Sequence, residues 1–306
     1  MGRMTGKVWG LDLRLWDVKR GTAIWADAAD KDVVIDMGSS GFSPLEHLSD
    51  RHGVRKINYM VVTHPHQDHI EDVVRYEDLN LRVSTLSHNP ATSPLLQANI
   101  DEEEDETYLD IATSYQEFLA RFTEPASIDP TSEEWAQGTT FTTFSLDAEQ
   151  VSGSRYRKMN NLSVMTVVER YGFKLVTAGD ILKSGLETMI QDSVVQEAVA
   201  DADVLIAPHH GRESSYHSEF VDTVDPQIVL ISDKSDDGNN HDAYYQFPGK
   251  RVHNERADET VERNALTTRQ DGRLRVRANT GKDWEVSFYP HFESRKSKGA
   301  MARTQD

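Results

Sequence analysis

The side chains best suited to chemistry lie in the six residues His64-Pro65-His66-Gln67-Asp68-His69. Three imidazoles and a carboxylate are ligand types that bind divalent metal ions in proteins. Two of these candidate ligands stand at i and i+2 and the other two at i+4 and i+5, so one turn of chain could serve two neighbouring cations. A solvated polar loop is the alternative interpretation, because a lone His-x-His pair is more often a surface feature than a ligand pair.

The residues on either side of this cluster predict the elements that position it. The apolar run Ile57–Val62 before it is typical of a buried strand. After it, Ile70, Val73 and Val74 recur at helical spacing, so the cluster lies where a strand gives way to a helix. A second apolar run, Leu81–Leu86, predicts another strand and therefore a parallel pair with a covering helix.

Two later strand ends also carry ligand-type side chains. A hairpin predicted within residues 162–178 delivers Asp180 directly after it, and a buried strand predicted at 204–207 ends in Pro208-His209-His210-Gly211. A single carboxylate or a single His-His pair could equally belong to a surface turn. Three strand ends that all carry such residues are much harder to obtain by chance, so we expect them to meet at one metal site.

The remaining patterns extend this mixed arrangement of strands and helices. Alternating runs within residues 8–36 predict antiparallel strands, and Asp36 near their end either closes a turn or supports the metal cluster. Runs at 265–269, 274–278 and 284–289 predict a closing three-stranded meander.

The composition is that of a folded globular protein, with 306 residues, 37% hydrophobic and 27% charged. No apolar run approaches the roughly 20 residues that span a bilayer, and Met1–Lys7 lacks the apolar core of a secretory signal, so we expect a cytoplasmic protein without membrane contact. The absence of cysteine excludes disulfides, thiol nucleophiles and thiolate ligands. We expect one domain over residues 7–290 and a flexible tail at 291–306.

Residues 89–137 differ in composition from the rest, and we expect an insertion there. Gln97–Glu134 contains twelve acidic residues and one basic residue. The apolar residues between Tyr108 and Phe122 follow the period of an α-helix and predict one amphipathic helix. The insertion is either a solvated surface segment or a lid or partner-binding surface.

The His64–His69 cluster resembles the His-x-His-x-Asp-His signature of the metallo-β-lactamase fold. Within that superfamily, the sequence most resembles the hydrolase domain of the ComEC-type DNA-uptake competence proteins and their soluble relatives. The further stretches similar to motifs of that family are Asp17–Ala23, Ile35–Gly38, Asn160–Ser163, Ala178–Asp180, Pro208–Gly211 and Thr268–Gly272 with Arg275. The resemblance runs from Val8 to Tyr289 and omits the acidic insertion.

The resemblance implies an α/β (α+β) fold, a four-layered αββα sandwich with two divalent metal ions, Zn or Mn, at one edge. The ligands it implies are His64 and His66 for the first metal, Asp68, His69 and His210 for the second, and Asp180 as the bridge between them. Asp68 and His209 are the residues expected to act in catalysis, Asp68 by orienting or deprotonating the attacking water and His209 by facing the substrate. Which of His209 and His210 is the ligand stays open at this point.

Three residues are candidates for substrate binding, namely Asn161, Arg212 and His241. Many superfamily members supply another His to the first metal where this sequence has Asn160 and Asn161, which implies a more open first site. Arg212 replaces the serine of the family's His-His-Gly-Ser motif, and it is either a phosphate clamp or a solvated surface arginine. Glu71-Asp72 replaces a Gly-Gly pair, which is expected to add bulk and charge beside the site.

These features predict a metal-dependent hydrolase, and the first hypothesis is a phosphodiesterase or nuclease. The net charge of −18 opposes a broad nucleic-acid groove and favours a small phosphodiester. The second hypothesis is a carbonyl hydrolase that acts on an ester, lactone, thioester or β-lactam with the same metals. The third is a partner-binding subunit that docks another protein through the acidic helix.

Overall fold

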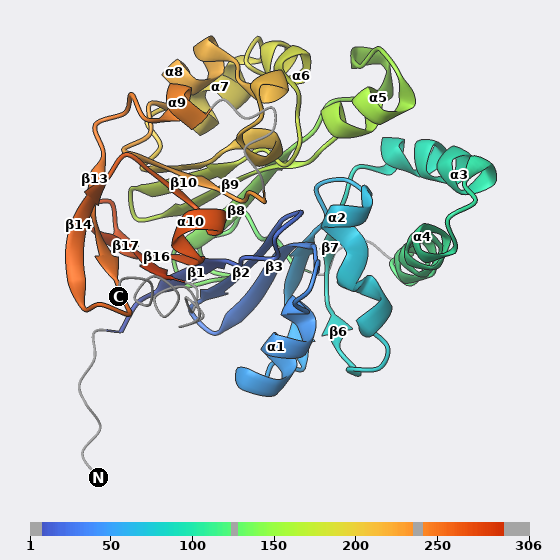
Figure 1. The fold of residues 1–306 in the computed structure, drawn as a ribbon, viewed down its shortest axis with the longest axis horizontal. Coiled ribbons are helices and arrows are strands. Elements are labelled where there is room, and N and C mark those ends of the chain that lie inside the picture. The colour runs from blue at the N-terminus through green and yellow to red at the C-terminus, as the bar shows by residue number, and fades with distance from the viewer. Residues whose placement is uncertain (1–7, 124–127, 235–240, 291–306) are drawn as a thin grey trace, which may run out of the picture.

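Two β-sheets lie face to face in the computed structural model, which describes residues 8–123, 128–234 and 241–290 (Figure 1). The first sheet has nine strands, in the spatial order β14 (Glu259–Arg263), β13 (Lys250–Asn254), β17 (Asp283–Tyr289), β16 (Arg273–Thr280), β1 (Leu11–Leu15), β2 (Ala23–Ala28), β3 (Lys31–Met37), β5 (Tyr59–Val61) and β7 (Leu86–Ser87).

The second sheet has six strands, in the order β15 (Ala265–Thr267), β12 (Ile228–Ile231), β11 (Val204–Ile206), β10 (Phe173–Thr177), β9 (Met165–Arg170) and β8 (Thr139–Phe144). A separate two-stranded pair joins β4 (Lys56–Ile57) to β6 (Arg82–Val83). In both large sheets, antiparallel hairpins adjoin parallel strands: β3, β5 and β7 run parallel, as do β10, β11, β12 and β15.

The main hydrophobic core lies between the two sheets. Strand β1 alternates fully buried leucines with partly exposed polar residues, which is the pattern of a strand with one buried face. Leu13 and Ile24 of the first sheet share one buried cluster with Phe141 and Leu175 of the second. This cluster joins the sheets into a sandwich.

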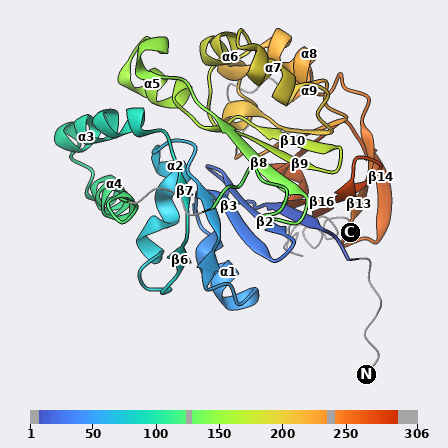
Figure 2. The same ribbon diagram turned by 180° about the vertical axis from the view of Figure 1, so that it is seen from behind.

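Helices cover the outer face of each sheet (Figures 1 and 2). The α-helices are α1 (Pro44–Arg51), α2 (Gln67–Ile70), α3 (Ser93–Glu102), α4 (Glu106–Leu119), α5 (Arg155–Asn161), α6 (Lys183–Met189), α7 (Ser193–Val199), α8 (Ser218–Val224), α9 (His241–Tyr244) and α10 (Thr268–Asp271). Short 3₁₀ helices are η1 (Glu71–Arg75), η2 (Pro90–Thr92), η3 (Ala148–Gln150), η4 (Pro208–Gly211) and η5 (Glu213–Ser215).

The helices form two outer layers, each with its own apolar cluster. Helices α6, α7 and α8 pack on the six-stranded sheet, where Leu186, Val195 and Phe220 are buried. Helices α1 and α2 lie on the other sheet, where Leu48 and Ile70 are buried. The four-layered αββα sandwich expected from the sequence is therefore confirmed.

The acidic insertion forms two helices, α3 and α4, where one had been expected. Both lie beyond α2 at one end of the sandwich, beside α5 (Figure 2). The apolar face of α4, which includes Ile111, Tyr115 and Phe118, is buried against α2 and η1. Its acidic face is exposed, so the helix covers core on one side and presents charge on the other.

Some sequence-based expectations about the elements were wrong. Strand β15 does not join a closing meander, because it pairs with β12 in the second sheet while β16 and β17 form a hairpin in the first. Strands β13 and β14 were not expected at all. The antiparallel strands expected within 8–36 and the parallel pair around the His64–His69 cluster are confirmed.

The single domain over residues 7–290 stays a prediction. Residue 7 and the tail at 291–306, expected to be flexible, lie outside the described residues. Among the residues that are described, no helix is both long enough and apolar enough to cross a bilayer.

Candidate metal centre

The ends of three strands bring the predicted ligands together at one edge of the sandwich. The His64–His69 cluster follows β5 of the first sheet. Asp180 follows β10, and His209 and His210 follow β11, both in the second sheet. Because β10 and β11 are parallel, their carboxyl ends lie side by side at the edge that faces the end of β5.

Asp180 is the centre of the cluster. Its Oδ1 lies 3.3 Å from Nε2 of His69, and its Oδ2 lies 3.8 Å from Nε2 of His64. The same Oδ2 lies 3.7 Å from Nε2 of His209 and 3.6 Å from Nε2 of His210. One buried carboxylate therefore contacts imidazoles from both sheets.

Asp68 and His66 extend the cluster on opposite sides of Asp180. Nε2 of His210 lies 3.6 Å from Oδ2 of Asp68. Nδ1 of His66 lies 2.8 Å from Nε2 of His64. His64 and His66 thus form one end of the site, and Asp68 with His210 forms the other.

Buried partners fix the orientation of the imidazoles. Nδ1 of His69 lies 2.7 Å from Oδ2 of Asp36, whose carboxylate also accepts hydrogen bonds from the backbone N–H and the hydroxyl of Thr63. Nδ1 of His210 lies 3.0 Å from the carbonyl oxygen of Ser232. These contacts turn each Nε2 toward the cluster, as expected for outer partners of metal-binding histidines.

Unusual backbone conformations place the two histidines that follow β11. His209 and His210 have φ values of 48° and 59°, in the left-handed region that costs a residue with a side chain about 1–3 kcal/mol. The backbone N–H of His209 donates to the carbonyl oxygen of Gly179, next to Asp180. The turn brings both imidazoles to the site from adjacent positions, which a regular helix or strand would not do.

The loop between β1 and β2 packs against the backbone of Asp68. The N–H of Thr22 donates to the carbonyl oxygen of Asp68 at 3.2 Å. Gly21 has a φ of +102°, and a Cβ on it would lie 1.9 Å from that same carbonyl oxygen. Glycine is therefore required at position 21 for the loop to approach Asp68.

Two facing sheets, helices on both outer faces and a His-x-His-x-Asp-His turn at one edge are together the features of the metallo-β-lactamase fold. This chain has that fold. No protein-family model matches the sequence, and no curated protein matches it.

Solved structures similar to this chain include several proteins of the metallo-β-lactamase fold. A diphosphatase from the PhnP family has 13% sequence identity over 78% of this chain and 92% of its own, with a TM-score of 0.43. The metallo-β-lactamase fold protein YhfI from Bacillus subtilis has 13% identity over 71% of this chain and 85% of its own, with a TM-score of 0.40. AidC, a dizinc quorum-quenching lactonase, has 15% identity over 52% of this chain and 55% of its own, with a TM-score of 0.35.

The pKa values at this edge of the metallo-β-lactamase fold reflect a buried cluster of carboxylates and imidazoles. Burial opposes protonation of His69, but the carboxylates of Asp180 and Asp36 outweigh it and raise the pKa of His69. Burial opposes ionisation of Asp180, but its histidine neighbours outweigh it and hold the pKa of Asp180 well below its usual range. Burial lowers the pKa of His66 to about 4 and also lowers that of His64. Neutral imidazoles and ionised carboxylates are the forms that bind metal. The low pKa values of Asp180, His64 and His66 therefore favour cation binding, whereas a cation would have to displace the proton that the carboxylates favour on His69 and His210.

The donor set fits a divalent cation on two independent observations. Nε2 of His69 and Nε2 of His210 are buried and make no hydrogen bond among the described residues. Ligand atoms around one tetrahedral Zn²⁺, each about 2.0–2.2 Å from it, lie roughly 3.3–3.6 Å apart, and the contacts of Asp180 with His69 and His210 are 3.3 Å and 3.6 Å. The groups whose ligand atoms all lie within 4.8 Å of one another are His64, His69 and Asp180, and Asp68, His69 and His210.

A cleft of about 190 Å³ lies over this cluster. Two arginines line it, Arg20 from the β1–β2 loop and the predicted Arg212 from the end of η4. Nε of Arg20 lies 3.6 Å from Oδ2 of Asp68, and the Arg20 side chain is 66% exposed. Tyr108 and Tyr156 line the side of the cleft that belongs to α4 and α5.

Sequence reasoning missed Arg20, Tyr108 and Tyr156. Arg20 lies in a stretch that was compared with a family motif, but nothing in its local pattern shows that the loop folds over Asp68. Tyr108 was assigned only to the apolar face of a helix. Their position in the cleft depends on contacts between distant segments.

Asn161 and the Glu71-Asp72 pair do not line the cleft. Asn161 is buried, and its side-chain oxygen accepts a hydrogen bond from the N–H of Leu182, so it holds the turn after Asp180 rather than facing a substrate. Asp72 is buried and accepts hydrogen bonds from Ser43 and from the N–H of Leu45, at the start of α1. The carboxylate of Asp72, which was expected beside the site, therefore lies at the start of α1 instead.

Two further candidate histidines, His241 and His88, are not among the clustered ligand atoms of the described residues. His241 begins α9, but its side chain lies outside the described part of the chain. His88, a loop histidine that the sequence offers as another possible ligand for the first metal, follows β7 and belongs to neither group of clustered ligand atoms.

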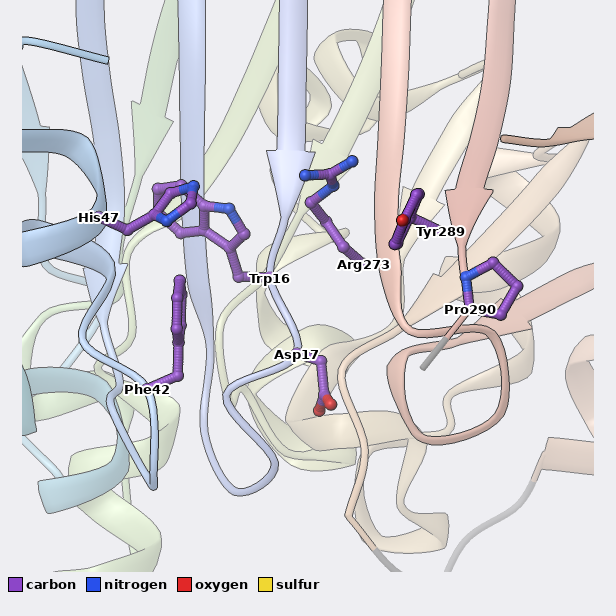
Figure 3. Close-up of a pocket in the computed structure, with 7 residues that line it drawn as sticks. All are labelled: Trp16, Asp17, Phe42, His47, Arg273, Tyr289 and Pro290. Carbon is purple, nitrogen blue, oxygen red and sulfur yellow. The ribbon is translucent and has the colours of Figure 1, made fainter. Parts of the chain in front are cut away.

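A separate hollow of about 320 Å³ lies at the ends of β1 and β17, beside α1 (Figure 3). Trp16, Phe42 and His47 face it from one side, and Arg273 and Tyr289 from the other. None of the predicted site residues lines this hollow. The residues with predicted chemical roles therefore lie at the metal-centre cleft and not at this hollow.

Proposed function

We propose that this chain is a metal-dependent hydrolase that cleaves phosphodiester bonds. The observation that carries the proposal is the position of Asp180, within 3.3–3.8 Å of four imidazoles, in a cleft that two arginines also line. Ionised carboxylates beside buried imidazoles are suited to divalent cations, and guanidinium groups are suited to phosphate oxygens.

The residues that would hold the metals divide into two sets that share Asp180. His64 and His66 form the first set, and Asp68, His69 and His210 form the second. Two divalent ions held there, Zn or Mn, would supply an activated water at neutral pH and stabilise the charge that develops at phosphorus and on the leaving oxygen. Among the two histidines after β11, His210 is the better ligand, because its Nε2 is an unpaired buried atom near both Asp68 and Asp180.

The other residues of the cleft would bind and orient the substrate. Arg212 and Arg20 would pair with the unesterified phosphate oxygens and turn the ester toward Asp68. Asp68 would accept a proton from the attacking water. His209, whose Nδ1 lies 3.1 Å from the hydroxyl of Ser215, would present its Nε2 to the leaving oxygen and stabilise the charge that develops there by a hydrogen bond.

The arginines favour phosphodiesters over carbonyl substrates. An ester, lactone or β-lactam carbonyl carries no formal charge before attack, whereas a phosphodiester is anionic in its ground state. Two guanidinium groups at one cleft therefore contribute more to binding a phosphodiester. The resemblance to ComEC-type domains also favours phosphodiester chemistry, with a nuclease as one form of it.

The test is hydrolysis of bis(p-nitrophenyl) phosphate, single-stranded DNA and p-nitrophenyl acetate by protein supplied with Mn²⁺ or Zn²⁺. We expect cleavage of a phosphodiester that is lost with EDTA, restored by metal, and absent from Asp180→Ala. Asp192→Ala, a substitution at the N-cap of α7 away from the cleft, is the control and should retain activity. Cleavage of the carbonyl ester alone would contradict the proposal.

A further inference from the structure

A second pocket, of about 370 Å³, adjoins the cleft at the candidate metal centre. His66, Tyr108 and Tyr156 line both spaces, so the two lie side by side. The second pocket is completed by the acidic insertion and by the start of α5, through Asn99, Glu102, Glu103 and Arg155. A substrate whose ester lies at the metal ligands would therefore extend along the insertion.

The ring of Tyr156 is a flat platform between the two pockets. It stacks on the imidazole of His66, with ring centroids 4.7 Å apart and an angle of 22° between planes. The side chain is nevertheless 52% exposed. An aromatic ring that is held on one face and accessible on the other is suited to stacking a planar ligand.

The wall opposite this platform is held in place by Arg155. Its guanidinium donates to the carbonyl oxygen of Ala98 at 3.0 Å, to the side chain of Asn99 at 3.1 Å and to the carboxylate of Glu102 at 2.9 Å. These bonds join α5 to α3. The insertion is therefore attached to the element that carries Tyr156, and the pocket is a built feature of the fold.

The wall carries two carboxylates, Glu102, which is paired with Arg155, and Glu103. One carboxylate oxygen of Glu103 accepts from the N–H groups of Glu104 and Asp105, which orients the side chain at the start of α4. The wall thus offers carboxylate oxygens, while the metal-centre cleft offers the guanidinium groups of Arg20 and Arg212. A ligand complementary to both ends is anionic at one end and carries N–H donors at the other.

We propose that the second pocket binds the amino-bearing base of a nucleotide-sized phosphodiester. The phosphate lies between Arg20 and Arg212, the base stacks on Tyr156, and its amino group donates to Glu103. This inference rests on the proposed function, since it places the phosphodiester at the metal ligands. It extends that function by naming the substrate class and by assigning a binding role to the acidic insertion.

The dimensions and charge of the pocket favour a single nucleotide unit over a nucleic-acid strand. The two spaces are about 190 Å³ and 370 Å³, which suits one phosphate and one base. The insertion that forms the wall carries a run of six acidic residues, Asp101–Glu106. Successive phosphates of a strand that passed this wall would be repelled.

Binding of reaction products tests the proposal without requiring turnover. Calorimetric titration of Mn²⁺-loaded protein with GMP and with ribose 5-phosphate compares two ligands that share a sugar phosphate and differ in the base. We expect GMP to bind about tenfold or more tightly than ribose 5-phosphate, since stacking of a base on an aromatic side chain contributes about 1–3 kcal/mol. Tyr156→Ala should remove this difference, and Tyr156→Phe should retain it.

Two controls separate the base site from indirect effects. Tyr171→Ala replaces another exposed tyrosine, on the β9–β10 turn, and should leave both affinities unchanged. Metal content of Tyr156→Ala should equal that of wild type, which excludes an effect through His66. Glu103→Gln should weaken GMP and leave ribose 5-phosphate unaffected.

Three outcomes would overturn the proposal. They are equal affinity for GMP and ribose 5-phosphate, tighter binding of phosphoethanolamine than of GMP, and much tighter, Tyr156-dependent binding of a single-stranded octanucleotide. Failure of the proposed function would look different. If GMP binds in a base-dependent way but no phosphodiester is hydrolysed, the base site is supported and the proposed phosphodiesterase activity is contradicted.

Discussion

Nδ1 of His69 lies 2.7 Å from Oδ2 of Asp36, and both side chains are inaccessible to solvent. The two residues come from different strands of one sheet: Asp36 is in β3, and His69 follows β5, which pairs with it in parallel. Asp36 has a φ of 61°, so its carboxylate leaves the regular strand direction to reach Thr63 and His69. The position of one candidate metal ligand is therefore set by a residue that cannot itself touch the metal.

Asp36→Asn should weaken metal binding by roughly 10–100-fold, the usual effect of losing an outer partner of a ligating histidine. An amide in place of the carboxylate no longer favours the His69 form that keeps Nε2 available. Competition titration with a chelating dye measures this affinity. Asp32→Asn, on the same strand and away from the cluster, should bind metal as wild type does. Equal affinities for Asp36→Asn and wild type would show that Asp36 does not orient the ligand.

Gly21→Ala should reduce both the unfolding free energy and metal affinity. A Cβ at this position would lie 1.9 Å from the carbonyl oxygen of Asp68, so the loop or Asp68 must move. Gly53 also has a positive φ, of +69°, but a Cβ there would meet nothing within 4 Å. Gly53→Ala should therefore lower stability by about 1–2 kcal/mol through backbone strain alone. Chemical denaturation and metal titration of both variants distinguish strain from displacement of Asp68.

Asp72 should make the stability of the protein depend on pH. Burial raises the pKa of Asp72 to about 6, despite its hydrogen bonds from the N–H of Leu45 and from Ser43. The folded state therefore binds this proton more tightly than the unfolded state, where the pKa is near 3.8. Unfolding free energy should fall as pH rises from about 4 to 6, by on the order of 2–3 kcal/mol from this group.

Denaturation of wild type and Asp72→Asn across that pH range isolates the effect of Asp72, because the other titrating groups are common to both proteins. The amide can still accept hydrogen bonds but cannot ionise. We expect the variant to gain stability relative to wild type as pH rises through 6. Parallel pH profiles would show that the pKa of Asp72 is the same in the folded and unfolded protein.

Arg212→Ala and Arg20→Ala should raise KM for a phosphodiester by about 10–100-fold each, the range for losing a hydrogen bond to a charged group. KM for an uncharged carbonyl ester should change little. Steady-state kinetics at two salt concentrations measure both effects, and the wild-type KM should rise with salt more steeply than that of the variants. Equal changes for the charged and the neutral substrate would contradict a role in phosphate binding.

The clustering of the candidate ligands could be predicted because its signals are local. His64, His66, Asp68 and His69 lie within one turn, and Asp180 and His210 each follow a recognisable apolar strand. Parallel strands end at the same edge of a sheet, so clustering follows from the order of the elements. The supporting role of Asp36 was one of two interpretations of its position, and the geometry of the fold favours it.

Other features depended on contacts that a single sequence does not display. The pairing of β15 with β12 replaces an expected meander, because residues 268–272 carry the chain from one sheet to the other instead of forming a hairpin turn. Asn161 looked like a substrate contact and instead holds the backbone of Leu182. Tyr156 stacks on His66 from α5, and its neighbour Arg155 joins α5 to α3 across more than fifty residues of chain.

The central claim is that one cluster of side chains binds two metal ions, and metal content measured by mass spectrometry tests it most directly. Wild-type protein equilibrated with Zn²⁺ or Mn²⁺ and then desalted should retain about two ions per chain, as expected for a two-metal hydrolytic site. The double variant His64→Ala, His66→Ala should retain about one, held by Asp68, His69, Asp180 and His210. The same metal content in wild type and double variant would contradict the account.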